Sequence, residues 1–200
     1  MVAAFDFDGT LTYRDTLIPF LARVSFFKLL LGLALVSPAL ARLMSGKAGN
    51  DHGMACREGA KQRLCRVVLR GRQRADLTAL AVRWTPGIAL RPDMLARLRT
   101  HQESGHRVVI VSASPDVYLD EVARRLGVEL ICTGLETSEG RLTGRFSTAN
   151  CWGPEKVARL ESRFGPVSDY ELHAYGDSSG DAWLLQAADC AWLNGEKVVR

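Results

Sequence analysis

The chain has 200 residues, 47% of them hydrophobic and 24% charged, with a formal net charge of +4. This length and apolar content allow a sizeable core, and they favour one domain with an insertion over two independent domains. The five cysteines are odd in number and none are spaced as CxxC, which indicates a reducing compartment. Because the chain starts directly with a strand pattern and not with a secretory leader, we expect a cytoplasmic protein.

An aspartate pair follows the first predicted element. Residues 2–5 are apolar and predict a short buried strand, and Gly9-Thr10 supplies the turn that ends it. Asp6 and Asp8 therefore stand at the carboxyl end of a strand, where open parallel sheets bind ligands. Two close carboxylates repel unless a cation or a shared proton reconciles them, and Mg²⁺ prefers carboxylates together with substrate phosphate oxygens. The segment predicts a phosphate-handling site, although calcium loops and ordinary Asx turns share the pattern.

Residues 13–86 have helical periodicity and little strand signal. They carry 13 Lys and Arg against 4 Asp and Glu, a net charge of +9, whereas the rest of the chain has −5. Such a charge is either a solvated helix face or a surface that attracts an anionic substrate or membrane. No aromatic interleaving or binding motif accompanies it, so we expect no nucleic acid partner. The densest basic run is Arg57, Lys61, Arg63, Arg66, Arg70, Arg72 and Arg74.

An apolar stretch, residues 24–43, lies within this helical segment. A bilayer span needs about 20 apolar residues, and here Lys28, Gly32 and Pro38 interrupt the run. We expect a buried helix, and the alternative is a segment that dips into a membrane interface beside the basic helix. Pro38 is expected to end or bend the helix and so to produce a helix-turn-helix.

The second candidate strand, residues 108–111, ends in small hydroxyl residues. Before it, residues 92–99 predict a helix that Gly105 ends. After it, Pro115 suits the first turn of another helix. Ser112 and the free backbone N–H groups of that helix start would bind an anion, unless Ser112 is only an ordinary N-cap.

Two later segments add charged groups. Residues 153–156 open an amphipathic helix, where Lys156 opposes the helix dipole unless an anion faces it or the side chain is simply solvated. Asp177 and Asp181 follow another strand pattern, residues 172–175, and could complete a metal shell. Asp181 could equally be an ordinary acid at a helix N-terminus.

In combination, four strand ends present Asp-x-Asp, Ser, Lys and Asp-x-x-x-Asp in that order. This pattern resembles the four-motif signature of the haloacid dehalogenase-like hydrolase superfamily, and the helical segment resembles that of subfamily IB, which includes phosphoserine phosphatases and phosphatidylglycerophosphatase C-like enzymes. The resemblance implies an α/β fold, a Rossmann-like parallel sheet core with an inserted helical C1 cap. It divides the chain into a core of residues 1–12 and 87–200 and a cap of residues 13–86. Residues 133–146 suit a β-hairpin accessory to the core sheet.

The resemblance also implies a role for each motif residue. Asp6 would be the nucleophile that forms an aspartyl-phosphate, and Asp8 the general acid that protonates the leaving oxygen and later activates water. Ser112 and Ala113 would bind the transferring phosphoryl group, and Lys156 would neutralise it. The implied Mg²⁺ ligands are Asp6, the backbone carbonyl of Asp8, Asp177 and, as support, Asp181.

The predicted activity is therefore Mg²⁺-dependent hydrolysis of a small phosphate monoester. Asp8 favours phosphate esters, because a departing halide needs no proton. Asp15 matches the position at which phosphoserine phosphatases carry a substrate-binding Glu, whereas Gly9 and Gly180 depart from the usual Ser and Asn. We expect phosphoserine or a related phosphate ester as the substrate. The alternatives are a phosphatidylglycerophosphate-type lipid phosphatase peripheral to the inner face of the membrane, a phosphotransferase with the same site, and a non-enzymatic binding module.

Overall fold

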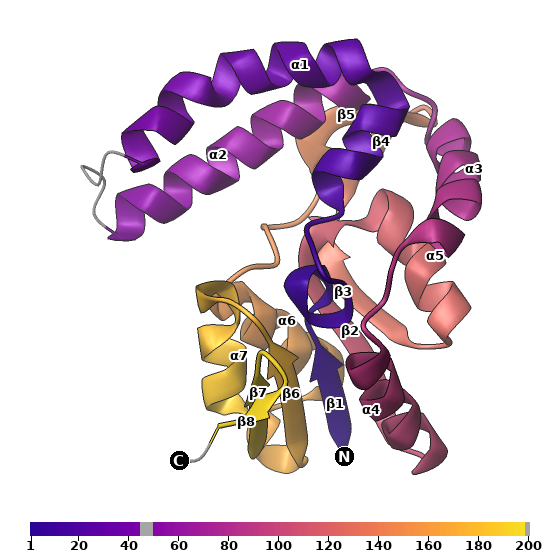
Figure 1. Ribbon diagram of the computed structural model, residues 1–200, viewed down its shortest axis with the longest axis vertical. Coiled ribbons are helices and arrows are strands. Elements are labelled where there is room, and N and C mark those ends of the chain that lie inside the picture. Colours follow the sequence, from indigo (N-terminus) through magenta and orange to yellow (C-terminus); the bar gives the residue numbers. More distant parts are fainter. Residues whose placement is uncertain (45–49, 199–200) are drawn as a thin grey trace.

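A six-stranded sheet forms the centre of the protein in the computed structural model, which describes residues 1–44 and 50–198, without the side chains of residues 37–57. The strand order is β3-β2-β1-β6-β7-β8, and all neighbours are parallel except β7 and β8. The predicted α/β fold with a mostly parallel sheet is thus confirmed (Figure 1). The strands are β1 (Val2–Phe5), β2 (Arg107–Pro115), β3 (Glu129–Thr133), β6 (Leu172–Gly176), β7 (Cys190–Leu193) and β8 (Glu196–Lys197).

Helices cover both faces of this sheet because its strands are apolar on both sides. Along β1, Ala3 and Phe5 pack in one buried cluster, with α4 (Pro92–Glu103) and α5 (Asp116–Leu126). Val2 and Ala4 pack in the other, with helices from later in the chain. The later helices are α6 (Pro154–Phe164) and α7 (Ala182–Ala187). Three short 3₁₀ helices among the described residues are η2 (Thr85–Gly87), η3 (Val167–Asp169) and η4 (Ser179–Asp181).

Three helices follow β1 and lie beyond the carboxyl ends of the strands (Figure 1). Helices α1 (Leu17–Met44) and α2 (Asn50–Leu69) run side by side, and α3 (Arg74–Trp84) packs against α5 before the chain returns to the core through α4. The helical character predicted for residues 13–86 is therefore confirmed. Pro38 does not end α1, which continues to Met44; the non-helical backbone lies instead at Ser25, where φ is −166° and ψ is 103°.

The predicted hairpin is present as β4 (Leu135–Ser138) and β5 (Arg141–Phe146), but it is not an accessory of the core sheet. It forms a separate two-stranded sheet, which is bonded to the segment that joins α2 and α3. The backbone N–H of Gly71 donates to the carbonyl of Leu142 at 2.8 Å, and the N–H of Leu142 donates to the carbonyl of Arg72 at 2.9 Å. The hairpin thus connects the core to the helical insertion, a long-range pairing that local turn signals cannot reveal.

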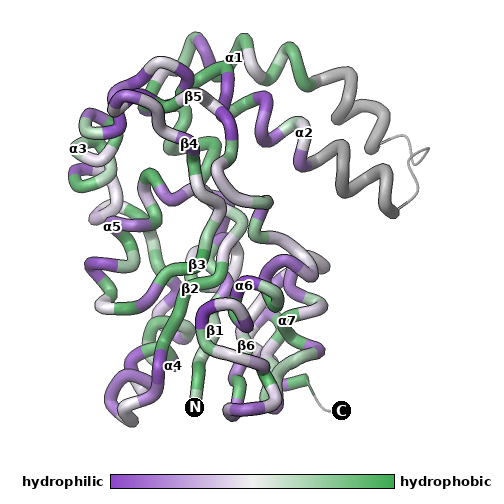
Figure 2. The backbone as a smooth tube through the Cα atoms, turned by 180° about the vertical axis from the view of Figure 1, so that it is seen from behind, coloured by the Kyte–Doolittle hydropathy of each residue, from purple (hydrophilic) through white to green (hydrophobic). Residues whose placement is uncertain are grey.

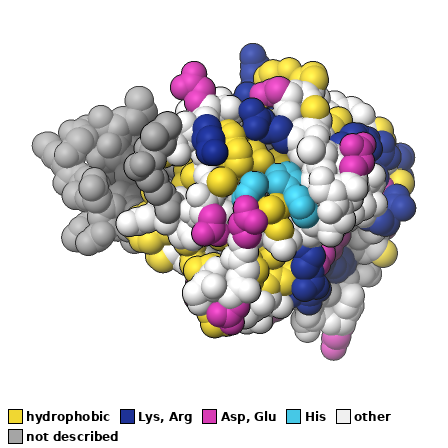
Figure 3. Space-filling view, turned by 90° about the horizontal axis from the view of Figure 1, so that it is seen from below, with side chains coloured by type: hydrophobic (Ala, Val, Ile, Leu, Met, Phe, Trp, Pro, Cys, Tyr) yellow, Lys and Arg dark blue, Asp and Glu magenta, His cyan; other side chains and the backbone are white. Residues whose placement is uncertain are grey.

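The opposite edge of the sheet, at the amino ends of the strands, carries a group of histidines (Figure 3). The ring of His101 lies 5.1 Å from that of His106 and 5.2 Å from that of His173. His101 also contacts the Tyr175 hydroxyl through Nε2, at 2.9 Å. Burial and the two other imidazoles lower the pKa of His101 to about 4, so this ring is neutral near pH 7. These histidines therefore lie at the opposite end of the strands from the acidic motifs.

Candidate active site

The carboxyl end of β1 turns sharply, and this turn places the first two motif aspartates. One wide helical turn, η1 (Phe7–Leu11), follows Asp6, and Gly9 within it has φ +87°, which favours glycine. A Cβ on Gly9 would lie 2.2 Å from Oδ2 of Asp177, so only glycine lets the turn approach that carboxylate. The Thr10 hydroxyl donates to Oδ1 of Asp177 at 3.4 Å. The turn therefore joins the ends of β1 and β6.

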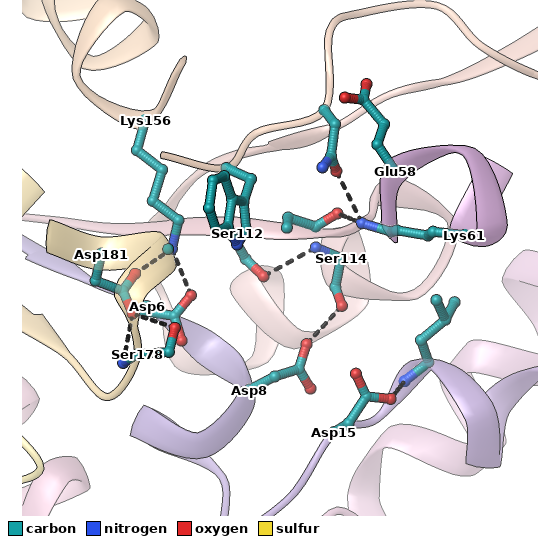
Figure 4. Close-up of a pocket in the computed structure, with 15 residues that line it drawn as sticks. Asp6, Asp8, Asp15, Glu58, Lys61, Ser112, Ser114, Lys156, Ser178 and Asp181 are labelled. Carbon is teal, nitrogen blue, oxygen red and sulfur yellow. Dashed lines mark hydrogen bonds and ion pairs between the residues drawn. The ribbon is translucent and has the colours of Figure 1, made fainter. Parts of the chain in front are cut away.

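Lys156 lies at the centre of a buried ionic cluster (Figure 4). Its Nζ donates to Oδ1 of Asp6 and to Oδ1 of Asp181, both at 2.6 Å. All three side chains are buried, so the first-turn lysine of α6 faces anions, as its position against the helix dipole predicts. Its two carboxylates hold the ammonium charged by raising the pKa of Lys156, against the effect of burial.

Asp181 keeps its second oxygen for the loop after β6. Its Oδ2 accepts from the backbone N–H of Asp177 and of Ser178, both at 3.2 Å, and from the Ser178 hydroxyl at 3.1 Å. Ser178 and Asp181 thereby form a capping box on η4. Asp181 is therefore both the expected acid at a helix start and a member of the ionic cluster. With both oxygens hydrogen-bonded, Asp181 is placed to hold Lys156 and the Asp177 loop in position.

Three acids form a group that fits a divalent cation. Asp6, Asp177 and Asp181 each offer a carboxylate oxygen, and these oxygens lie within 4.8 Å of one another. Burial raises the pKa of Asp6 to about 7; Lys156 counteracts part of this rise, and the charges of Asp181 and Asp8 add to it. Burial and Asp181 also raise the pKa of Asp177. One ammonium does not balance three carboxylates, and hard oxygen ligands in this arrangement suit Mg²⁺.

The side chain of Asp8 points away from that acidic group (Figure 4). Its Oδ1 accepts from the backbone N–H of Thr16 at 2.7 Å and from the Thr16 hydroxyl at 2.6 Å, while Oδ2 accepts from the Ser114 hydroxyl. The Thr16 hydroxyl also contacts the Tyr118 hydroxyl at 3.0 Å. Burial, followed by the charge of Asp15, raises the pKa of Asp8, which favours a carboxyl that can carry a proton.

The second motif lies deeper in the strand than expected. Strand β2 continues to Pro115, and α5 begins only at Asp116, so Ser112 is not at a helix start. The buried Ser112 hydroxyl accepts from the backbone N–H of Ser114 at 3.1 Å and lines the cavity beside Asp6. The carbonyl of Ala113 accepts a bond from Lys61.

Lys61 is a cation from the helical insertion that reaches the core. Besides the Ala113 carbonyl, its Nζ donates to Oδ1 of Asn150 at 3.0 Å. The Thr133 hydroxyl contacts the same two acceptors, at 2.6 Å and 3.1 Å. Burial lowers the pKa of Lys61. These bonds connect α2 directly to the strand ends of the core.

One cavity of about 310 Å³ lies between the core and the insertion, and its lining includes Asp6, Asp8, Ser112, Lys156 and Asp181 (Figure 4). The insertion contributes Asp15, Leu17, Glu58 and Lys61 to its wall, and the core contributes Trp152 among others. Asp15 has a structural task as well, since its Oδ1 accepts from the backbone N–H of Leu17 at 3.0 Å at the start of α1. The cavity has the size of a site for a small molecule.

Lys61, Ser114 and Thr16 surround the motif residues, but their positions in the site were not predicted from the sequence. A signal for Lys61 exists in the sequence. It stands three, four and seven residues before Leu64, Cys65 and Val68, which are buried, so it shares their helix face, unlike the exposed Arg63 and Arg66. No comparable signal marks Ser114 or Thr16, whose role depends on where Asp8 turns.

Comparison with known families assigns the class. The family model for haloacid dehalogenase-like hydrolase matches residues 3–186, so the chain belongs to this family of hydrolases, and the resemblance drawn from the four motifs is confirmed.

Individual relatives refine this picture. Over 193 residues the chain is 37% identical to Protein CicA of Caulobacter vibrioides, which covers 94% of this chain and 83% of that protein. A crystal structure of a protein of unknown function from Bordetella pertussis Tohama I superposes with a TM-score of 0.67 at 23% identity, over 95% of this chain and 87% of the other. A substrate-bound phosphoserine phosphatase superposes with a TM-score of 0.62 at 18% identity, over 96% of this chain and 84% of the other, and thus shares the fold.

Proposed function

We propose that this protein is a Mg²⁺-dependent phosphatase of phosphate monoesters that works through an aspartyl-phosphate on Asp6. The observation that carries the proposal is the group of the buried Asp6 and Asp181 and the half-buried Asp177, with Lys156 between Asp6 and Asp181. Such a group combines a carboxylate nucleophile with the positive charge that phosphoryl transfer requires. Its position at the carboxyl ends of β1 and β6, beneath a small cavity, suits the binding of a phosphate.

In the proposed reaction, a carboxylate oxygen of Asp6 attacks phosphorus, and the bond between phosphorus and the ester oxygen breaks. The leaving oxygen takes a proton from Asp8, whose raised pKa favours the protonated form and whose bonds to Thr16 and Ser114 orient the carboxyl. Water then attacks phosphorus and gives a proton to Asp8. The bond between phosphorus and the Asp6 oxygen breaks, so phosphate is released and the Asp6 carboxylate is restored. Lys156 stays charged throughout and offsets the negative charge on Asp6.

Mg²⁺ would be held by Asp6, Asp177 and the backbone carbonyl of Asp8, with Asp181 as support. When bound, the ion supplies charge neutralisation for the phosphoryl oxygens and the nucleophile. Ser112 and Ala113 would then bind the phosphoryl group from the other side.

We further propose that residues 13–86 act as a cap on a core of residues 1–12 and 87–200. The bonds from Lys61 to the Ala113 carbonyl and Asn150 support this, because they close α2 over the strand ends. A cavity of about 310 Å³ favours a small phosphorylated metabolite, such as phosphoserine or a related phosphate ester. Asp15 and Glu58 line this cavity, and their carboxylates would receive a cationic group of such a substrate.

The test is phosphate release from an aryl phosphate with Mg²⁺ and with EDTA, for the wild type, Asp6→Asn and the control Asp93→Asn, an exposed aspartate that pairs with Arg91. We expect Mg²⁺-dependent release by the wild type and the control and none by Asp6→Asn. Equal release by the wild type and Asp6→Asn would overturn the proposal. A panel of amino-acid phosphates, sugar phosphates and phosphatidylglycerophosphate then selects the substrate, and product analysis with added alcohol acceptors separates hydrolysis from phosphotransfer.

A further inference from the structure

Helix α1 has two apolar stripes, and only one of them is covered. The inner stripe includes Leu29 and Val36, which are buried. It also includes Gly32, where an added Cβ would lie 2.9 Å from the Leu64 side chain of α2. The second group, here called the outer stripe, repeats at helical spacing on the opposite side. Its members and their exposed fractions are Phe26 57%, Phe27 84%, Leu30 48%, Leu31 55% and Leu35 49%.

The prediction of a buried helix is therefore confirmed for the inner stripe and wrong for the outer stripe, as far as residue 36; the side chains of residues 37–43 lie outside the described part. The window Leu17–Val36 is long and apolar enough to cross a membrane by length and composition, yet only 28% of it is buried. An ordinary amphipathic helix would show polar side chains on its solvent side. Isolated exposed apolar residues are normal, but five on successive turns of one face indicate an interaction surface.

The outer stripe faces away from the candidate active site. Figures 1 and 2 show α1 as the outermost element, with α2 between it and the core. The cavity is lined by Glu58 and Lys61 of α2, whereas the described side chains of α1, residues 17–36, contribute only Leu17. A partner on the outer stripe would thus leave the cavity unobstructed.

We propose that the outer stripe lies on the surface of an anionic lipid bilayer, with α1 parallel to the membrane plane. Charge selects this partner. The sequence has no Asp or Glu from residue 16 to residue 50, and Lys28 lies among the outer-stripe residues. Arg63 and Arg66 of α2 are also exposed. An apolar helix face accompanied by Lys and Arg is the pattern of an interfacial helix.

A second copy of the chain fits this surface less well. A symmetric dimer through the outer stripe would bring two insertions of net charge +9 together, and like charges across an interface oppose association. A spanning orientation does not fit either, because the inner stripe is packed on α2, whose exposed arginines would be drawn into hydrocarbon.

Co-sedimentation with vesicles tests the proposal. The vesicles contain phosphatidylcholine with phosphatidylglycerol, or phosphatidylcholine alone, at low and high salt. The test variant is Phe27→Gln with Leu31→Gln, which keeps good helix formers, and the matched control is Val82→Gln, an exposed apolar residue of α3. Urea unfolding of each variant shows whether it is folded.

We expect the wild type and the Val82→Gln control to sediment with the anionic vesicles, less at high salt and less with phosphatidylcholine alone. The double variant should lose at least about tenfold in partition coefficient, because two large apolar side chains no longer leave water. Failure of the wild type to bind anionic vesicles overturns the proposal, as does equal binding by the double variant or equal binding to both lipids. A wild-type dimer that the double variant converts to a monomer, without vesicle binding, would assign the stripe to a second copy instead.

Discussion

Replacing Lys156 by Met tests the ionic cluster, because this change removes the ammonium and keeps most of the apolar stem. In the wild type the ammonium contacts Asp6 and Asp181 at 2.6 Å, and all three side chains are buried. Removing one partner of a buried ion pair costs about 3–5 kcal/mol, because the remaining charge is left uncompensated. We expect a loss of this size in the free energy of unfolding at pH 8 in EDTA.

The pH dependence makes the prediction more specific. The pKa of Asp6 rises from 3.8 to about 7 on folding, so the folded state holds more protons than the unfolded state between these values. The wild type should therefore lose stability as pH rises from about 4 to 7, at up to about 1.4 kcal/mol per pH unit, and then level off. Without the ammonium the pKa of Asp6 lies higher still, so the decline of Lys156→Met continues above pH 7.

Urea unfolding followed by tryptophan fluorescence from pH 5 to pH 9 measures both effects. The control is Lys197→Met, an exposed lysine, which should change stability by less than about 0.5 kcal/mol. The reasoning is refuted if Lys156→Met loses less than about 1 kcal/mol at pH 8 and follows the wild-type slope throughout.

Three further changes probe the metal ligands and the general acid. Asp177→Asn should raise the Mg²⁺ concentration for half-maximal phosphate release at least about tenfold, with a smaller effect at saturating Mg²⁺, and unchanged Mg²⁺ dependence would remove it from the ligand set. Gly9→Ala should weaken Mg²⁺ binding and stability, because the added Cβ meets Asp177. The control is Gly105→Ala: Gly105 has φ +69° with open space around its Cβ position, so this change should cost only about 1–2 kcal/mol of backbone strain. Equal Mg²⁺ affinities of the two variants, measured by titration, would contradict this. Ser114→Ala removes a bond that lowers the pKa of Asp8, so the alkaline limb of the kcat profile should move to higher pH, and an unmoved limb would exclude Asp8 as the acid.

The motif residues could be predicted because parallel strands bring their carboxyl ends to one edge. Asp6 and Lys156 are 150 positions apart in the chain. Asp6 directly follows β1, and Lys156 lies in the first turn of α6 and faces the end of that strand, so strand patterns and topology suffice to bring them together. The alternation that places Ala3 and Ala4 on opposite faces is also written in the sequence.

Other features depend on tertiary packing and could not be predicted. The direction of the Asp8 side chain is decided by Thr16 and Ser114, which local pattern does not mark as partners. The pairing of the hairpin with the end of α2 is a contact between segments 70 residues apart, as in the bond of Arg141 to the Gly71 carbonyl. Pro38 is a helix breaker by propensity, but propensity is a weak guide where packing decides, and α1 continues past it.

The most direct measurement is the position of the covalent phosphoryl group during turnover. Rapid acid quench with a phosphate ester, followed by borohydride reduction and peptide mass spectrometry, converts an aspartyl-phosphate to homoserine. We predict homoserine at position 6 in the wild type with Mg²⁺, and none after incubation with EDTA. Reduction at another aspartate, or phosphate release in a burst with residue 6 unmodified, would contradict the proposed mechanism.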